Sequence, residues 1–338
     1  MSQSSNMEDL RGIAGIRKRP AMYIGDIGQT GLHHLIFELF DNSVDQYFAG
    51  NVTWVKIEID GSCIRVSDDG KGLPFDQPAD TGGSSLATHY LTCIHDRATA
   101  DGHAPHLHFR GHGVGLVAVN ALSASLTCRS WRSGQLWEQS FVQGHPTDAP
   151  GIVKSGSGSG TCIEFVADPL VFRDATIDTV KLRAFFFEAA HLTPGLKVRF
   201  QAECFQSQNG IADLVRFHST LRRFTGDVFS IHQECEDFEV YAAAAGSVSK
   251  AADTDWMTWC NGSRTLEHAS HKTAFAKALG TLGWRPGIAM IHVLMRNPQY
   301  GTPTKSRLTN LDLVTPLAAV VRTELRSWCE TAGIGNFA

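Results

Sequence analysis

The sequence lacks any hydrophobic run approaching the roughly 18 consecutive apolar residues that a membrane-spanning helix requires. Its first eleven residues are polar and contain no apolar core followed by a cleavage site, which a secretory signal would show. These two absences argue against a membrane-embedded or secreted protein. We therefore expect the chain to be cytoplasmic.

Charged residues and clustered cysteines are also scarce. Charged residues make up only 19% of the 338 positions, and the net charge of −4 excludes a strongly basic nucleic-acid binder. None of the eight cysteines stands close to another in the chain, which excludes a zinc knuckle and a redox CxxC pair. Reduced thiols in the cytoplasm are the expected state.

Helical and strand patterns alternate along the chain. Apolar residues at helical spacing predict a helix over 32–47, and alternation around an Asp-Gly turn predicts a β-hairpin over 55–66. Helices and antiparallel hairpins mixed in this order favour an α+β fold over a doubly wound one. The other predicted elements are a helix over 115–122, a hairpin turning at 133–134, a strand over 161–166, a helix over 176–191, a strand over 197–201 and a strand-like run over 290–295.

The length suits about two domains of roughly 150 residues each. An Asn-Gly pair at 209–210 follows the strand predicted over 197–201 and marks a turn. We therefore place a domain boundary there, which gives predicted domains 1–208 and 209–338.

A polar stripe runs along the first predicted helix. Glu38, Asn42 and Asp45 are spaced i, i+4 and i+7, so their side chains emerge on one side of an otherwise apolar helix. A solvated helix face is one interpretation. The other is a carboxylate that orients water beside an amide oxygen that ligates Mg²⁺, an ion that prefers oxygen donors.

Two glycine-rich segments follow. Asp68 and Asp69 end the predicted hairpin and continue into GKGLP at 70–74, where glycines allow a ligand to approach the backbone closely. GHGVG at 111–115 opens a helix, a position that favours phosphate, although such a string alone is often a flexible loop. A Rossmann fold would require a strand directly before it, whereas 101–110 is loop-like and rich in histidine.

Together, ELFDN at 38–42, DDGKGLP at 68–74 and RGHGVGLVAVNALS at 110–123 resemble the ATP-binding boxes of the GHKL ATPases. The segments GIRKRPAMYIG at 15–25 and GLHH at 31–34 resemble the opening of the DNA gyrase B and topoisomerase IV family. NGSRTLEHASH at 261–271 resembles its transducer segment, and Pro303-Thr304-Lys305 stands where that family carries a Gln-Thr-Lys loop. The resemblance extends over about residues 10–330.

This resemblance implies a two-layer GHKL (Bergerat) α/β sandwich followed by a smaller α+β transducer domain. It implies that Glu38 is the general base for ATP hydrolysis, that Asn42 ligates Mg²⁺, and that Lys305 reaches the γ-phosphate. Asp68 would accept a hydrogen bond from the adenine amino group, supported by Thr161. The remaining nucleotide-binding positions carried over are Asp45, Gly72, Gly111, His112, Gly113, Val114 and Gly115.

Several positions depart from the family pattern. Lys71 stands where the family usually has arginine and Gln46 where it has an acidic residue, which removes an ion pair at the pocket mouth. A pocket arginine is replaced near Glu138, and Pro303 replaces the glutamine of the lysine loop. The five histidines at 95, 103, 106, 108 and 112 lack an accompanying cysteine or carboxylate cluster, so a lid over the nucleotide explains them better than a metal site.

The function that the resemblance implies is Mg²⁺-dependent ATP hydrolysis in the ATPase region of a gyrase B-like type IIA topoisomerase. Its implied partners are ATP, a second copy of the chain, DNA and a gyrase A-like protein. The family's metal-binding cleavage domain has no counterpart in these 338 residues. The alternative is a stand-alone GHKL ATPase or ATP-sensing module that serves a different protein partner without cleaving DNA.

Overall fold

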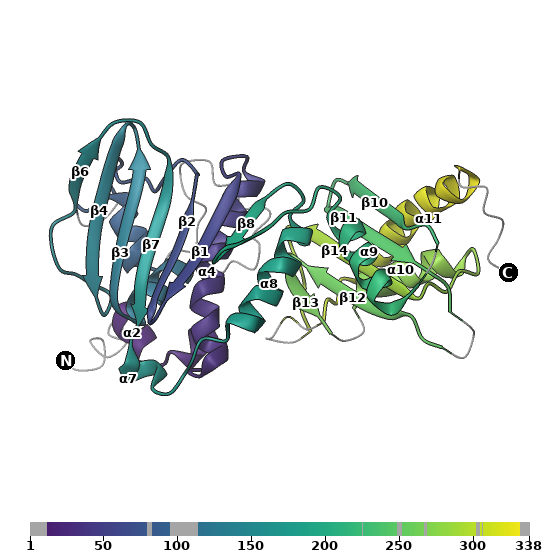
Figure 1. Cartoon of the computed structure of the whole chain (residues 1–338), viewed down its shortest axis with the longest axis horizontal. Helices are drawn as coiled ribbons and strands as arrows, with labels where there is room; N and C mark the ends of the chain where they lie inside the picture. Colours follow the sequence, from purple (N-terminus) through teal and green to yellow (C-terminus); the bar gives the residue numbers. More distant parts are fainter. Residues whose placement is uncertain are drawn as a thin grey trace. The chain divides into compact units, whose positions relative to one another are not determined.

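The computed structural model describes residues 12–79, 83–94, 114–224, 226–248, 252–266, 269–301, 305 and 307–331. The chain divides into two compact units (Figure 1). The first comprises Met1–Phe187 and Leu196–Phe205, and the second comprises Glu188–Gly195 and Gln206–Ala338.

A mixed and mainly antiparallel sheet forms the centre of the first unit (Figure 1). Its described strands are β1 (Trp54–Asp60), β2 (Cys63–Asp68), β3 (Ser123–Arg132), β4 (Gln135–Val142), β5 (His145–Pro146), β6 (Gly151–Ser155), β7 (Gly160–Ala167), β8 (Lys197–Phe200) and β9 (Glu203–Phe205). They run in the order β5-β4-β3-β7-β2-β1-β8-β9, with β6 paired to β4. Strands β1 and β8 are parallel. This order brings the end of β2 beside the beginning of β7.

Helices cover one face of this sheet. They are α2 (Ile13–Lys18), α3 (Ala21–Ile24), α4 (Gln29–Phe48), α5 (Leu86–Thr92), α6 (Gly115–Ala121), α7 (Pro169–Phe172) and α8 (Thr179–Leu192). Val55 and Ile57 alternate with polar residues along β1 and are fully buried, as a strand with one covered face requires. Phe40 of α4 packs edge-on against Phe186 of α8, with ring centroids 5.2 Å apart. The long polar-striped helix α4 is thereby fixed against the sheet.

The second unit contains a smaller sheet in the order β10-β11-β14-β12-β13 (Figure 1). Its elements are α9 (Ile211–Arg222), β10 (Phe229–Glu234), β11 (Phe238–Ala245), β12 (Asp255–Cys260), β13 (Ser263–Thr265), α10 (Ser270–Gly280), β14 (Ile288–Met295), the 3₁₀ helix η1 (Leu311–Leu313) and α11 (Val314–Thr331). Its hydrophobic core joins the sheet to α10 and α11 through residues such as Val240, Phe275 and Leu317.

The predicted α+β fold is confirmed, and so are the elements predicted in the first unit. The helix predicted over 32–47 is α4, and the hairpin predicted over 55–66 is β1–β2. Ser133 and Gly134 both adopt positive φ, of 53° and 73°, which suits the tight turn predicted between β3 and β4. The predicted helix over 115–122 is α6, and that over 176–191 is α8.

No helix in the described part of the chain combines the length and hydropathy that crossing a bilayer would demand.

Candidate nucleotide site

Glu38 is the buried carboxylate of helix α4, with only 8% of its surface exposed. His34 lies one turn earlier, and its Nε2 is 2.9 Å from Glu38 Oε1. A Cβ atom built on Gly115 would come within 2.3 Å of Glu38 Oε2, so a larger residue cannot occupy this position without displacing the carboxylate. The beginning of α6 therefore lies directly against the predicted base.

Asp68 ends strand β2 and accepts three hydrogen bonds. Its Oδ2 accepts from Ser43 Oγ at 2.9 Å, and its Oδ1 accepts from the backbone N–H groups of Gly70 and Thr161 at 2.9 and 3.2 Å. Burial raises the pKa of the Asp68 carboxyl above its usual range, although these three hydrogen bonds act in the opposite direction. The structure thus brings Asp68 and Thr161 together as predicted, and it adds Ser43 of α4.

The loop after Asp68 is held against strand β3. Gly72 has a φ of 77°, and a Cβ atom there would lie 2.1 Å from the carbonyl oxygen of Trp131, so glycine is required on both counts. The next residue, Leu73, donates its N–H to Ser130 Oγ at 2.7 Å. This close approach gives the backbone around Gly72 a defined position beside the Asp68 carboxylate.

Asn42 lies on α4 next to Ser43. Within the described ranges, its buried Nδ2 atom has no hydrogen-bond partner. An amide end that is buried yet unsatisfied is uncommon, and the O and N of an asparagine exchange places according to their partner. A cation bound to phosphate would supply a partner for the oxygen, so the residue fits the Mg²⁺ role. Asp45, the third residue of the stripe, is also buried.

The second unit contains the other predicted residues. Lys305 has a φ of 57°, and its Nζ lies 5.8 Å from the centroid of the Tyr300 ring. In the transducer-like segment, Asn261 pairs with the Met295 backbone through two hydrogen bonds of 2.8 Å. His271 is fully buried, and burial lowers its pKa to about 3. Asn261 and His271 therefore stabilise the second unit internally.

Several predicted positions lie outside the described residues. Gly111, His112, Gly113, Pro303 and the histidine-rich stretch over 95–112 belong to this group. Val114 and Gly115 are described, and Val114 precedes the first turn of α6.

The departures from the family pattern have local partners. Gln46 Oε1 accepts a hydrogen bond from Asn51 Nδ2 at 2.9 Å. Glu138 of β4 stands opposite Arg129 of β3, and their side chains form an ion pair of 2.5 Å. The charge of Glu138 is therefore balanced across the hairpin.

Two residues that contact the site were not predicted from the sequence. His34 stands four residues before Glu38, which is the spacing that places side chains together on a helix, so the pattern contained a usable signal. Ser43 had no such signal, because its contact with Asp68 depends on how α4 packs against β2.

A buried carboxylate on a long helix, an aspartate at a strand end and a glycine-rich helix start, all on one side of a mixed sheet, define an ATPase of the GHKL class. Residues 27–170 match the model of the histidine kinase-, DNA gyrase B- and HSP90-like ATPase family. Relatives that align with nearly the whole chain identify the branch of this class.

The chain is 30% identical over 359 residues to the DNA gyrase B protein of Thermotoga maritima, an alignment that covers 96% of this chain and 56% of that protein. It is 32% identical over 285 residues to the DNA gyrase B protein of Campylobacter jejuni, covering 82% of this chain and 36% of that protein. The chain thus spans about half or less of the length of these relatives.

Solved structures agree. The 43K ATPase domain of Thermus thermophilus gyrase B, crystallised with an aminocoumarin, superimposes with a TM-score of 0.82 at 26% identity, covering 97% of this chain and 92% of that one. The ATP-binding domain of Francisella tularensis topoisomerase IV gives a TM-score of 0.77 at 22% identity, which supports the fold. The chain belongs to the gyrase B-like branch of the GHKL ATPases, and ATP binding and hydrolysis are the activity of that branch.

Proposed function

We propose that this chain is the ATPase region of a gyrase B-like type IIA topoisomerase, in which residues 1–208 bind ATP and residues 209–338 transmit its state. The observation that carries the proposal is the Glu38 carboxylate, which is buried, paired with His34 and packed against Gly115. In this proposal, ATP promotes association of two copies of the chain. A gyrase A-like protein and DNA are the further partners.

Glu38 is the proposed general base, which accepts a proton from the attacking water. His34 is a positioning residue, because its Nε2 fixes one carboxylate oxygen and leaves the other, Oε2, facing the start of α6. Proton transfer to a positioned carboxylate contributes about 10²–10⁴-fold to a reaction rate.

Asn42 is the residue that would hold Mg²⁺, since its amide is adjacent to Ser43 and one helical turn from Glu38. A magnesium ion bound with ATP would neutralise phosphate charge as the terminal phosphoryl group is transferred. Gly72 and Gly115 allow the backbone to approach the nucleotide closely, and Gly111 and Gly113 are proposed to complete the phosphate loop.

Asp68→Asn should weaken ATP binding by about 1–3 kcal/mol, because the amide presents a donor to the adenine amino group and leaves a buried group unsatisfied. Wild-type protein should bind GTP poorly, since guanine has no amino donor at that position. Calorimetric titration with ATP and GTP measures both effects. Equal affinity for the two nucleotides in the wild type would contradict the assignment.

Asp69→Asn is the matched control. Asp69 lies next in the chain, but its carboxylate accepts hydrogen bonds from the backbone N–H groups of Thr53 and Trp54, at 2.8 and 3.0 Å. The preference for ATP should survive this substitution.

Lys305→Ala should reduce ATP hydrolysis strongly and leave ADP affinity nearly unchanged, because the proposed contact is with the γ-phosphate alone. A ligand shifts an equilibrium only through its differential interaction with two states, so such a contact suits a switch. Turnover assays and small-angle scattering with ADP and a non-hydrolysable ATP analogue test this. Identical scattering of the wild type with both nucleotides would refute the switch.

Lys272→Ala is a close control for Lys305, because both ammonium groups lie over an aromatic ring of the second unit. The Lys272 Nζ is 5.5 Å from the centroid of the Trp256 ring. Loss of that lysine should leave turnover unchanged.

The second candidate function is an ATP-sensing module that binds nucleotide with little turnover and serves another protein. The observation that favours it is the changed pocket rim, where Gln46 is bonded to Asn51 and Glu138 to Arg129. Single-turnover hydrolysis of labelled ATP separates the two candidates. Binding without phosphate release would support the sensor.

A further inference from the structure

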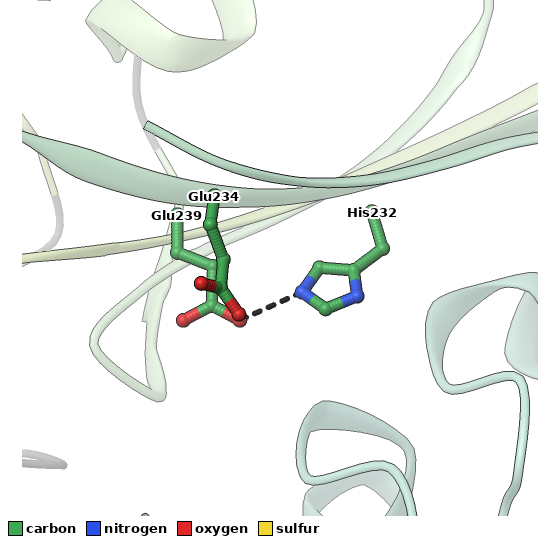
Figure 2. Close-up of side chains that lie close together, drawn as sticks. All are labelled: His232, Glu234 and Glu239. Atoms are coloured by element: carbon green, nitrogen blue, oxygen red, sulfur yellow. Dashed lines mark hydrogen bonds and ion pairs between the residues drawn. The ribbon is translucent and has the colours of Figure 1, made fainter. Parts of the chain in front are cut away.

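The hairpin formed by β10 and β11 carries three metal-ligating side chains on one face, far from α4 in the sequence. His232 and Glu234 are two residues apart on β10, so they point to the same side of the strand. Glu239 of β11 is the direct cross-strand partner of Glu234. Figure 2 shows the two carboxylates side by side with the imidazole of His232 turned toward them.

The three potential ligand atoms lie within 4.8 Å of one another. His232 Nε2 is 2.8 Å from Glu239 Oε1. A tetrahedral zinc ion with bonds of about 2.0–2.2 Å holds its ligand atoms about 3.4 Å apart, so rotation of the exposed side chains is sufficient to close the group around one ion.

Charge also favours a cation at this place. Two carboxylates directly opposite each other on an antiparallel pair destabilise the hairpin. A divalent ion balances the two negative charges of Glu234 and Glu239, and the imidazole of His232 supplies a nitrogen ligand. A mixed nitrogen and oxygen donor set suits Zn²⁺ and related first-row ions better than Mg²⁺ or Ca²⁺, which prefer oxygen alone.

Tyr241 restrains two of the three ligands. Its ring stacks on that of His232, with centroids 4.1 Å apart and an interplanar angle of 8°. Its hydroxyl also donates a hydrogen bond to Glu239 Oε1. Groups that orient ligands in this way raise metal affinity, because less side-chain freedom is lost on binding. Glu239 is correspondingly shielded, with 17% of its side chain exposed against 51% for His232.

We propose that His232, Glu234 and Glu239 form a surface site for a zinc-type divalent ion, with water completing its coordination. The site is independent of the ATP pocket proposed above. β10 is an edge strand of the second sheet, so an ion there pins the outer strand to β11. The Cys235 side chain packs toward the hydrophobic core on the opposite face, so we expect no sulfur ligand.

The test is calorimetric titration of the full chain with ZnCl₂ in the absence of nucleotide. Because the other histidines and the thiols also bind zinc, every protein should carry His103, His106 and His108→Gln and be compared by difference. The wild-type hairpin should bind one more equivalent than the Glu239→Gln and His232→Gln variants. Zinc should also raise its melting temperature by several degrees, an increase that both variants lose.

Glu236→Gln is the matched control, since it removes the same charge from the exposed turn of the same hairpin. It should retain the additional equivalent. X-ray absorption on the wild type minus Glu239→Gln difference should show only nitrogen and oxygen ligands. Equal zinc stoichiometry in the wild type and both variants would overturn the proposal, as would loss of the equivalent in Glu236→Gln alone.

Discussion

Replacing Glu38 with glutamine should lower ATP turnover by about 10²–10⁴-fold while leaving ATP affinity nearly intact. The amide has the shape of the carboxylate, so it fits between His34 and Gly115, but it cannot accept the proton of the attacking water. Single-turnover phosphate release measures the chemical step, and calorimetry measures binding. Unchanged phosphate release in a folded variant would remove Glu38 from the mechanism.

Glu164→Gln provides the comparison for Glu38. Glu164 lies on β7 in the same unit, and its half-buried carboxylate pairs with Arg65 on β2. Exposed ion pairs of this kind contribute at most about 1 kcal/mol to stability, so the substitution should leave both turnover and ATP affinity close to wild type.

The sequence predicted well those parts of the first unit whose structure depends on local pattern. The helix that carries Glu38 and Asn42 follows from apolar spacing, and the hairpin that ends at Asp68 follows from alternation around a turn. Thr161 joined Asp68 in the prediction only through the family resemblance. The physical reason is that β7 pairs with β2 across almost a hundred residues of chain, and no local periodicity specifies such a pairing.

The adjacent histidines His33 and His34 illustrate a limit of sequence interpretation. His34 faces Glu38, whereas His33 is buried and its Nε2 accepts a hydrogen bond from the Asp178 N–H at 2.9 Å. Burial lowers the pKa of His33, which keeps the ring neutral and able to accept. Helical spacing alone separates the two faces but does not reveal that α8 covers one of them.

The β10–β11 metal cluster was not predicted from the sequence for a similar reason. His232 and Glu234 form only a short alternation, and Glu239 joins them through the register of the hairpin. The histidine-rich segment over 95–112 attracted the metal hypothesis instead, because its histidines stand close together in the chain.

Gly115→Ala should reduce turnover by about 100-fold, although alanine is the better helix former. In a helix interior, alanine is favoured over glycine by about 1 kcal/mol, so an open site would gain stability from this change. The added Cβ, however, would lie 2.3 Å from Glu38 Oε2, and the carboxylate must move to admit it. Displacement of a reacting group by about 1 Å costs on the order of 10²-fold in rate.

A double-mutant cycle decides whether the Gly115→Ala effect acts through Glu38. In a Glu38→Gln background the base is already absent, so Gly115→Ala should remove little further activity, because residues that act as one unit are not additive. Gly151→Ala is the control substitution, since an added Cβ on that residue of β6 meets no atom within 4 Å. Additive losses in the double mutant would mean that Gly115 serves the phosphate-binding backbone instead of the position of the base.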